Sequence, residues 1–380
     1  MENPISRRSD GQRFPHFMLK EIYEQPATVR RILQHWVGAS GRFIGPRGLF
    51  SPEEMRRLSK VTIAASGSSR HAGLVAKFML ETLAGVLVEV DFASQYCYRD
   101  PVVWPDELTV LISQSGTTVD TLAALQEARR KGSKCLAICN VLDSPLTRGA
   151  DATLLTYAGE EVAIAATKSF TAQLTALLLL SLYIAQCRQT SFESIEILQR
   201  ELKTLPGTLE RVLLLDKQCR ELAAKFAGAT NFLVMGRNID YPIALEGALK
   251  LKETSYIQAE GYPTGEIKHG PAALIDKDLP ILILAARDEN DPASMVRYAR
   301  TVSNIREFTE RRVSIVAVIT DGDHEIVNVT PNVISLPAVP VLLQPILEAI
   351  PLQMLAYQIG ALRGYDVDRP RNLSKSVLVE

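Results

Sequence analysis

The apolar residues of this chain fall into short continuous runs that alternate with longer segments of helical period. In the first half, the runs occupy residues 61–65, 86–92, 108–113, 135–141 and 152–157. Apolar runs of this length are typical of strands that are buried on both faces. Their alternation with helices predicts a parallel sheet covered by helices on both sides. We therefore expect an α/β fold.

The same order of segments begins again near residue 231. Runs at 231–236, 281–286 and 314–320 match the first, third and fourth runs of the first half. We interpret this repeat as an internal duplication, which predicts two tandem doubly wound, flavodoxin-like units with parallel sheets. The expected division is an N-terminal extension and helix at 1–40, a first domain at 41–200, a second domain at 201–365 and a C-terminal tail at 366–380.

The amino-acid composition excludes several classes of partner and location. The 380 residues include 42 lysines and arginines against 43 aspartates and glutamates, so we expect neither nucleic acid nor a membrane surface as partner. The apolar segment 174–185 is too short for a bilayer and predicts a buried helix. Residues 1–13 look disordered and lack the apolar core of a signal peptide. Five scattered cysteines without metal-site spacing predict a reduced, cytoplasmic protein with no metal.

Two loops rich in hydroxyl groups follow the first and third apolar runs. They are Ser66-Gly67-Ser68-Ser69 and Ser113-Gln114-Ser115-Gly116-Thr117-Thr118. Ligands of such sheets bind beyond the carboxyl ends of the strands, where the N–H groups and positive end of a following helix attract an anion. Because no Gly-Lys-Ser/Thr motif is present, we favour a phosphorylated small molecule over a nucleotide. The alternative is a pair of ordinary helix N-caps.

A helical segment of the second half carries carboxylate and ammonium groups on one face. Glu246, Lys250 and Glu253 are four and three residues apart within the string ALEGALKLKE, so they project together from a mostly apolar helix. This trio suits proton transfer, because the lysine keeps one glutamate ionised while burial raises the basicity of the other. The polar stretch 265–270 could bring His269 over the same face. The alternative is an ordinary salt-bridge pair beside a chance histidine.

These strings, together with HFMLKEIYEQP, GEIKHGPAALID and DVDRPRNLSKSVLVE, resemble the SIS (sugar isomerase) family over nearly the whole chain. Within it, the chain is most similar to the isomerase half of the glutamine–fructose-6-phosphate aminotransferases. The resemblance implies a phosphate site made by hydroxyl and amide groups of the two loops: Gly67, Ser68, Ser69, Ser113, Gln114, Ser115 and Thr118. It also implies that Ile164 and Ser374 line the sugar.

The resemblance further implies a catalytic set that needs no cofactor. Glu253 would move a proton between C1 and C2 of the sugar, with Glu246 and Lys250 in support. His269 would open the sugar ring, reaching in from the partner subunit of a homodimer. Lys375 on the C-terminal tail would form a transient imine with the ketose carbonyl.

We expect an enzyme that interconverts glucosamine-6-phosphate with fructose-6-phosphate plus ammonia. The aminotransferases begin with a glutaminase domain, whereas this chain starts close to the isomerase half, so we expect no glutaminase activity and favour deamination. The close alternative is synthesis, with ammonia free or delivered by a separate glutaminase chain. Lesser alternatives are plain isomerisation, deglycation of a fructosamine phosphate, and a sugar-phosphate sensor without turnover. Thr117, Ala166 and Ser374 stand where the family usually has Glu, Ser and Ala.

Overall fold

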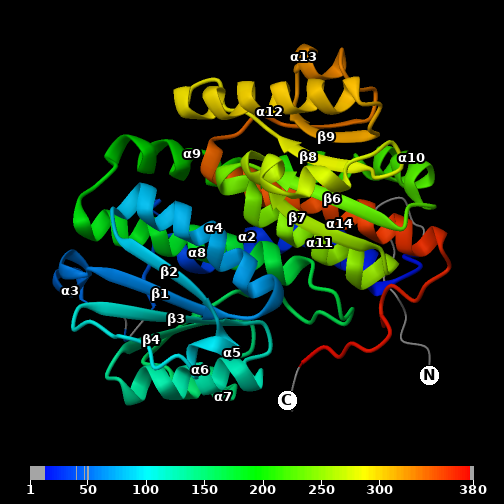
Figure 1. Ribbon diagram of the computed structural model, residues 1–380. Helices are drawn as coiled ribbons and strands as arrows, with labels where there is room; N and C mark the ends of the chain where they lie inside the picture. Colours follow the sequence, from blue (N-terminus) through cyan, green and yellow to red (C-terminus); the bar gives the residue numbers. More distant parts are fainter. Residues whose placement is uncertain (1–12, 40, 47, 49–50, 377–380) are drawn as a thin grey trace. The chain divides into compact units, whose positions relative to one another are not determined.

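The computed structural model describes residues 13–376 except 40, 47, 49 and 50. The chain divides into two compact units, each built on a five-stranded parallel sheet between helices (Figure 1). The β1–β5 unit comprises Gln25–Glu161, Lys168–Pro206 and Ser374–Glu380, and the β6–β10 unit comprises Met1–Glu24, Val162–Thr167 and Gly207–Leu373. Apart from Arg13, the N-terminal stretch predicted to be disordered lies outside the described residues.

The sheet of the β1–β5 unit has the strand order β2-β1-β3-β4-β5, and all neighbouring strands are parallel. The strands are β1 Lys60–Ala65, β2 Leu87–Phe92, β3 Glu107–Ser113, β4 Lys134–Cys139 and β5 Ala152–Leu155. Its helices are α2 Gln25–Trp36, α3 Pro52–Arg57, α4 Gly67–Ala84, α5 Ala93–Tyr96, α6 Val119–Arg130, α7 Pro145–Gly149 and α8 Lys168–Arg188. Helix α9, Phe192–Leu213, is divided between the units at Pro206.

Helices cover both faces of this sheet, which explains why its three central strands are apolar and almost wholly buried. Figure 1 shows α4 and α8 on one face and α5, α6 and α7 on the other. Helix α8 is long and apolar enough to cross a membrane by length and composition, but 83% of that stretch is buried inside the structure. It is the buried helix that the apolar segment 174–185 predicts.

The sheet of the β6–β10 unit has the order β7-β6-β8-β9-β10, again with all neighbours parallel. The strands are β6 Asn231–Gly236, β7 Gln258–Pro263, β8 Ile281–Ala285, β9 Ile315–Thr320 and β10 Val333–Leu336. Taken in this direction, each strand has the same place as its counterpart in the first sheet. The prediction of two flavodoxin-like, doubly wound units is therefore confirmed.

The helices of the β6–β10 unit also form two layers. They are α1 Phe17–Tyr23, α10 Asp216–Phe226, α11 Tyr241–Ser255, α12 Pro292–Glu310, α13 His324–Val327 and α14 Gln344–Leu362, with 3₁₀ turns η1 Asn238–Asp240, η2 Thr264–His269, η3 Pro271–Leu274 and η4 Val341–Leu343. Helices α11 and α14 lie on one face of the sheet, and α12 and α13 lie on the other (Figure 1).

Helices α11 and α14 run parallel and in close contact. A Cβ atom on Gly247 of α11 would lie 2.8 Å from the end of the Leu352 side chain of α14, so a larger residue here would force that side chain to shift. One to two turns further along both helices, the Thr254 hydroxyl donates to the carbonyl of Ala356 at 2.9 Å. The same register brings the start of α11 beside the start of α14.

The structure corrects two local predictions. Strands β7 and β10 were not predicted, because they lie at sheet edges, where alternating burial leaves no continuous apolar run. The turn predicted at Ser66–Ser69 is the beginning of a helix, since α4 starts at Gly67. The strands and helices predicted between residues 60 and 140 otherwise have their expected types.

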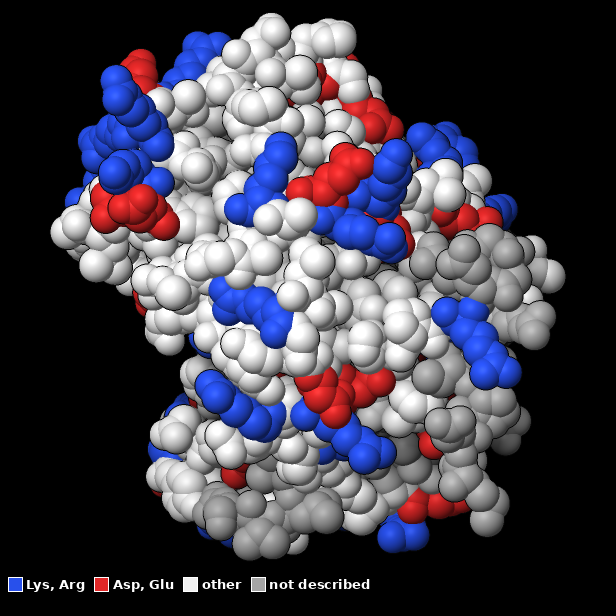
Figure 2. Space-filling model, turned by 90° about the vertical axis from the view of Figure 1, so that its right-hand side faces the viewer, with Lys and Arg blue, Asp and Glu red and all other residues white. Residues whose placement is uncertain are grey.

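Charged side chains of both signs are interspersed on the face of the molecule that Figure 2 shows, with wide uncharged areas between them. This distribution agrees with a formal net charge of −1 for the whole chain.

Candidate active site

Helix α11 carries the predicted trio of two carboxylates and one lysine. Lys250 is completely buried, and its Nζ lies 3.3 Å from Glu246 Oε1 and 2.5 Å from Glu253 Oε2. Glu246 is also buried, whereas 19% of the Glu253 side chain is exposed. The trio is therefore more than a solvated salt bridge, and Glu253 is the member that a ligand can reach.

The charges of the trio compensate one another. Burial by itself would lower the pKa of Lys250, because the ammonium loses its hydration. The Glu246 and Glu253 carboxylates outweigh this loss and raise the pKa of Lys250 above its ordinary value. Lys250 thus stays protonated and balances the carboxylates beside it. A partly open carboxylate held by a fixed cation has the arrangement that a general base needs.

Local packing fixes the position of helix α11 and therefore of the trio that it carries. The helix has Pro242 in its first turn, where a missing N–H is tolerated, and it ends at Tyr256 in the left-handed conformation with φ of 54°. Gly261 of β7 lies against the helix backbone, since a Cβ there would be 2.6 Å from Leu245 Cα. Strand β7 and helix α14 therefore hold α11 from two sides.

His269 is the last residue of η2, and its side chain is exposed. The neighbouring Lys268 forms an ion pair with Glu307 of α12 at 2.8 Å, which anchors the end of η2. An exposed imidazole on an anchored turn is available to a ligand or a neighbouring subunit. Its service to the site of a partner subunit stays a prediction.

The loop between β3 and α6 is folded around its own hydroxyl groups. Ser113 is buried at the end of β3, where its Oγ accepts the Gly116 N–H at 3.0 Å and lies 3.0 Å from Thr118 Oγ1. Ser115 Oγ lies 2.9 Å from Thr117 Oγ1 and accepts the Thr117 N–H at 3.2 Å. The loop therefore gathers hydroxyl groups at the start of α6.

Two further features fix the shape of this loop. Gly116 has φ of 68°, and a Cβ on it would lie 2.1 Å from Ser144 Oγ, so no other residue fits. The backbone N–H of Asn140 donates to the Gln114 carbonyl at 3.2 Å, while its Oδ1 accepts the Ala158 N–H at 2.7 Å. Sequence reasoning missed Asn140, because a lone asparagine after a strand carries no signal of such a role.

Ordinary helix capping does not account for the two hydroxyl-rich loops. Ser66 is the N-cap of α4 and Thr118 the N-cap of α6, yet neither side chain makes a capping hydrogen bond. Ser51, Ser144 and Asp291 do cap their helices in this way. Because β1 and β3 are neighbours in the sheet, both loops lie at the same edge, beside two helix N-termini. This arrangement suits an anion such as a phosphate group.

The C-terminal tail brings Lys375 to a buried carboxylate of the β1–β5 unit. Lys375 Nζ lies 2.6 Å from Glu161 Oε2, and the Glu161 side chain is completely buried. Sequence reasoning placed Lys375 on the C-terminal tail but missed this ion pair. Ser374, beside the lysine, is exposed, and its hydroxyl donates to the Ser376 carbonyl at 3.1 Å.

The preceding part of the tail belongs to the β6–β10 unit. The Asp368 carboxylate accepts the N–H groups of Phe17 and Met18 at 2.9 and 2.7 Å, and the Asp368 carbonyl accepts the Ile164 N–H at 3.0 Å. Ile164 and Ser374 thus belong to different units. Their predicted place beside the sugar stays a prediction.

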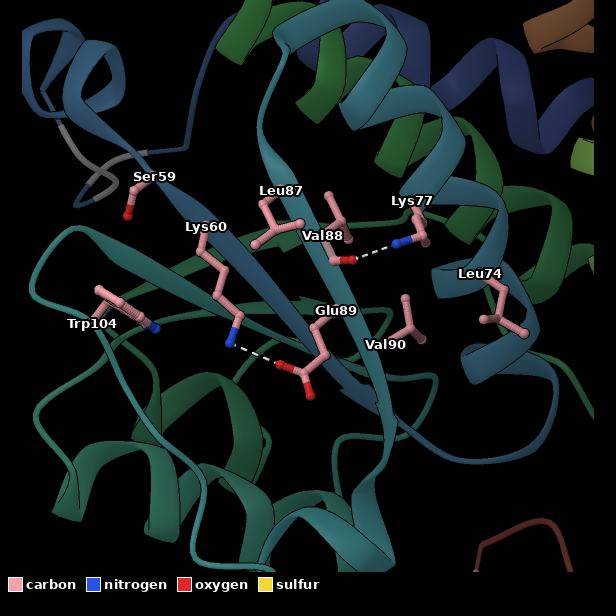
Figure 3. Close-up of a pocket in the computed structure, with 9 residues that line it drawn as sticks. All are labelled: Ser59, Lys60, Leu74, Lys77, Leu87, Val88, Glu89, Val90 and Trp104. Carbon is pink, nitrogen blue, oxygen red and sulfur yellow. Dashed lines mark hydrogen bonds and ion pairs between the residues drawn. The ribbon is translucent and has the colours of Figure 1, made fainter.

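A cavity of about 670 Å³ lies along the outer edge of β2 (Figure 3). Its lining is mainly apolar and includes Leu74, Leu87, Val88, Val90 and Trp104. The charged groups around it are already engaged, since Lys60 pairs with Glu89 at 2.8 Å and Lys77 donates to the Val88 carbonyl at 2.8 Å. No residue of the trio or of the hydroxyl-rich loops lines this cavity, so we do not place the active site there.

The protein is a doubly wound α/β protein, because both of its parallel sheets have a flavodoxin-like strand order. Its polar sites are like those of an enzyme: one sheet carries the hydroxyl-rich segments, and the other carries the buried acid–lysine trio. The chain belongs to the SIS domain family, which matches residues 54–183 and 225–363. Each matched segment contains one of the two sheets. The resemblance described from the sequence is therefore confirmed.

Several curated relatives match almost the whole chain. The glutamine–fructose-6-phosphate aminotransferase (isomerizing) of Chlorobaculum tepidum is 43% identical over 368 residues, which cover 97% of this chain and 59% of that protein. This chain thus spans about three fifths of the length of the curated relatives it matches. The C-terminal domain of glucosamine-fructose-6-phosphate aminotransferase from Francisella tularensis has a TM-score of 0.87 at 37% identity, covering 96% of this chain and 100% of that one.

The fold extends to more distant proteins. A structure of glucosamine-6-phosphate deaminase from Thermotoga maritima has a TM-score of 0.71, covering 96% of this chain and 100% of that chain. Its identity to this chain is 21%, so the likeness concerns the fold alone.

Proposed function

We propose that this protein interconverts glucosamine-6-phosphate with fructose-6-phosphate plus ammonia. The observation that carries the proposal is the trio on α11, in which a buried lysine holds the partly exposed Glu253 carboxylate at 2.5 Å. A protein that only binds a sugar phosphate has no use for such a base. The names of the aminotransferase relatives support the same substrates.

In this proposal, the β1–β5 unit binds the phosphate group. The first turn of α4 with its N-cap Ser66 and the loop Ser113–Thr118 supply hydroxyl and N–H donors, with backbone help from Gly67, and the N-termini of α4 and α6 favour the negative charge. Hydrogen bonds to a charged group are individually strong, at about 1.5–3 kcal/mol each. Phosphate recognition then fixes the sugar for the chemistry at C1 and C2.

The chemistry uses an imine and a proton transfer. The Lys375 ammonium first releases one proton, its neutral amine adds to the C2 carbonyl of the ketose, and the same proton returns to the C2 hydroxyl, which leaves as water to give the protonated imine. Ammonia then displaces the lysine amine at C2. Glu253 removes a proton from C1 and delivers it to C2 while the C1 hydroxyl loses its proton, which yields the aldehyde and the 2-amine. Deamination is the same sequence in reverse.

We propose net deamination wherever free ammonia is scarce, because a low ammonia concentration shifts the equilibrium towards fructose-6-phosphate and ammonia. The alternative is synthesis with ammonia from solution or from a separate glutaminase chain, and the names of the aminotransferase relatives favour it. We propose the cytoplasm as the compartment, since none of the five cysteines, all of them in the described part of the chain, forms a disulfide.

The direct test is to incubate the protein with glucosamine-6-phosphate and, separately, with fructose-6-phosphate plus ammonium, and to follow both products. We expect turnover in both directions, a synthetic rate that rises with ammonium, and no product from glutamine. Glu253→Gln is the control for contaminating enzymes. Binding of both sugars without any turnover would replace the enzyme proposal with the sugar-phosphate sensor.

We further propose a homodimer in which His269 serves the site of the partner subunit. The exposed position of His269 at the end of η2 supports this assignment. Inactive His269→Ala subunits mixed with inactive Glu253→Gln subunits would form heterodimers with one intact site, so up to half of the activity per heterodimer should return. No recovery after verified subunit exchange would place both residues in one site of the same chain.

A further inference from the structure

Glu161 is a buried acid in direct contact with the lysine to which the proposed function assigns the imine. Its Oε1 accepts the backbone N–H of Ser169 at 3.0 Å, and its Oε2 accepts the Ser169 hydroxyl at 2.7 Å. Ser169 is the second residue of α8, a helix of 21 residues, so the positive helix end stabilises the negative charge of the carboxylate. The Glu161 carboxylate is therefore fixed in position before any substrate arrives.

The remaining side of this carboxylate faces Lys375. The distance of 2.6 Å joins Glu161 Oε2 to Nζ, the atom that would attack the substrate carbonyl. The Lys375 side chain is 27% exposed, whereas that of Glu161 is completely buried. The amine therefore contacts the acid on one side and is open to a ligand on another.

An ammonium group cannot attack a carbonyl, so a lysine that forms an imine near neutral pH must first transfer a proton to an acceptor within hydrogen-bond reach. The protonated imine that results carries a positive charge on the same nitrogen. A fixed, buried carboxylate beside that nitrogen meets both requirements. A solvated surface carboxylate would do so weakly, because water screens its charge.

We propose that Glu161 is a catalytic residue that serves Lys375 as proton acceptor, proton donor and counter-ion. Its carboxylate takes one proton from the Lys375 ammonium, and the neutral amine adds to the C2 carbonyl to give a carbinolamine. The Glu161 carboxylic acid returns the proton to the C2 hydroxyl, which leaves as water, and the protonated imine remains paired with the Glu161 carboxylate. The net reaction converts the carbonyl and the ammonium into the protonated imine and water.

This inference rests on the proposed function, and one experiment separates the two. Fructose-6-phosphate is mixed with enzyme and quenched with borohydride at increasing times, and the rate of covalent labelling at Lys375 is measured. Glu161→Gln keeps the size of the side chain and an acceptor for Ser169 but loses the proton-transfer function, so labelling should be about two to four orders of magnitude slower. The control is Glu81→Gln, which removes one partner of the half-buried Lys77–Glu81 pair at 3.0 Å and should label at the wild-type rate.

A second variant separates chemistry from mere anchoring of the tail. Glu161→Ala leaves space beside Nζ, and added formate should restore part of its labelling rate, whereas formate should not help Glu161→Gln. If the wild type is not labelled at Lys375, the imine of the proposed function fails. If the wild type is labelled but Glu161→Gln matches it, or formate leaves Glu161→Ala unchanged, the role of Glu161 is overturned.

Discussion

The two units share one strand order but differ in the loops and helices that come after corresponding strands. Strand β3 ends in Ser113 and a loop of hydroxyl groups, whereas the loop after its counterpart β8 holds Arg287, whose Nη1 lies 3.4 Å from the buried Asp323. The Arg287 side chain in the loop after β8 is therefore already paired with a carboxylate of the same unit. Conversely, the acid–lysine trio comes after β6 on α11, while the helix after β1 begins with glycine and two serines. In the proposed function, the repeated scaffold thus separates anion recognition from proton transfer.

Within the β6–β10 unit, a second contrast concerns buried acids. The carboxylates of the trio share a buried cation, whereas Asp240 in η1 and Glu348 in α14 are buried acids without a cation between them in the part of the chain that the structure describes. Burial raises the pKa of Asp240 to about 7, and burial together with the nearby Asp240 charge raises the pKa of Glu348 well above its ordinary value. Buried carboxyl groups are therefore tolerated here either by pairing with a lysine or by holding a proton.

The largest expected effect concerns the base. Glu253→Gln keeps the shape of the side chain but cannot accept a proton, so turnover should fall by about two to four orders of magnitude while sugar-phosphate binding is retained. Incorporation of solvent deuterium at C1 and C2 measures the step directly. Exchange at the wild-type rate in Glu253→Gln would assign the base to another residue and remove the contrast between the units.

The next effect concerns the cation of the trio. Lys250→Met leaves Glu246 and Glu253 without the cation between them, so the free energy of unfolding should fall by about 3–5 kcal/mol. Urea denaturation measures it. The matched control is Lys217→Met, which breaks an exposed pair with Glu221 at 3.9 Å and should cost less than about 1 kcal/mol. Equal losses in the two variants would mean that the buried trio is no more than a surface pair in energetic terms.

A third effect is a pH dependence set by the buried acids Asp240 and Glu348, where burial outweighs the opposing charge of Arg297 on Asp240. The unfolded chain releases the Asp240 proton near pH 4, but the folded protein holds it until about pH 7, so the free energy of unfolding should fall as pH rises between these values. Denaturation at pH 5, 6 and 7 measures the slope, and Glu348→Gln should reduce it. A free energy of unfolding that rises over this range would contradict the assignment.

The smallest of these effects concerns the hydroxyl-rich loop. Ser113→Ala or Ser115→Ala should raise KM for the phosphorylated sugar by about ten- to a hundredfold, the loss of one hydrogen bond to a charged group. Ser51→Ala, which removes the N-cap of α3, is the control and should leave KM unchanged. An unchanged KM in both loop variants would mean that this loop does not bind the phosphate group.

The parts of the site that could be predicted from the sequence are those with a local pattern. The spacing of Glu246, Lys250 and Glu253 places them on one helix face, and the hydroxyl-rich loops come after apolar runs that are recognisable as buried strands. Continuous apolar runs likewise predicted the central strands of both sheets. The edge strands β7 and β10 have no such run, because several of their positions are only partly buried or exposed and carry polar residues.

Other contacts have no local pattern. Glu161 and Lys375 are separated by 214 residues, so no spacing rule connects them. Asp240 and Glu348 approach each other because η1 with α11 and the first part of α14 pack together, which no local spacing indicates. Such pairs depend on tertiary packing and become visible only in the folded chain.

The central claim is that one unit binds the phosphate and the other moves the proton. The most direct test compares kcat and KM for glucosamine-6-phosphate in Ser113→Ala and Glu253→Gln under identical conditions. The account predicts a raised KM with kcat retained for Ser113→Ala, and a lowered kcat with KM retained for Glu253→Gln. If both variants change the same parameter, or if the two effects are exchanged, the division between the units is wrong.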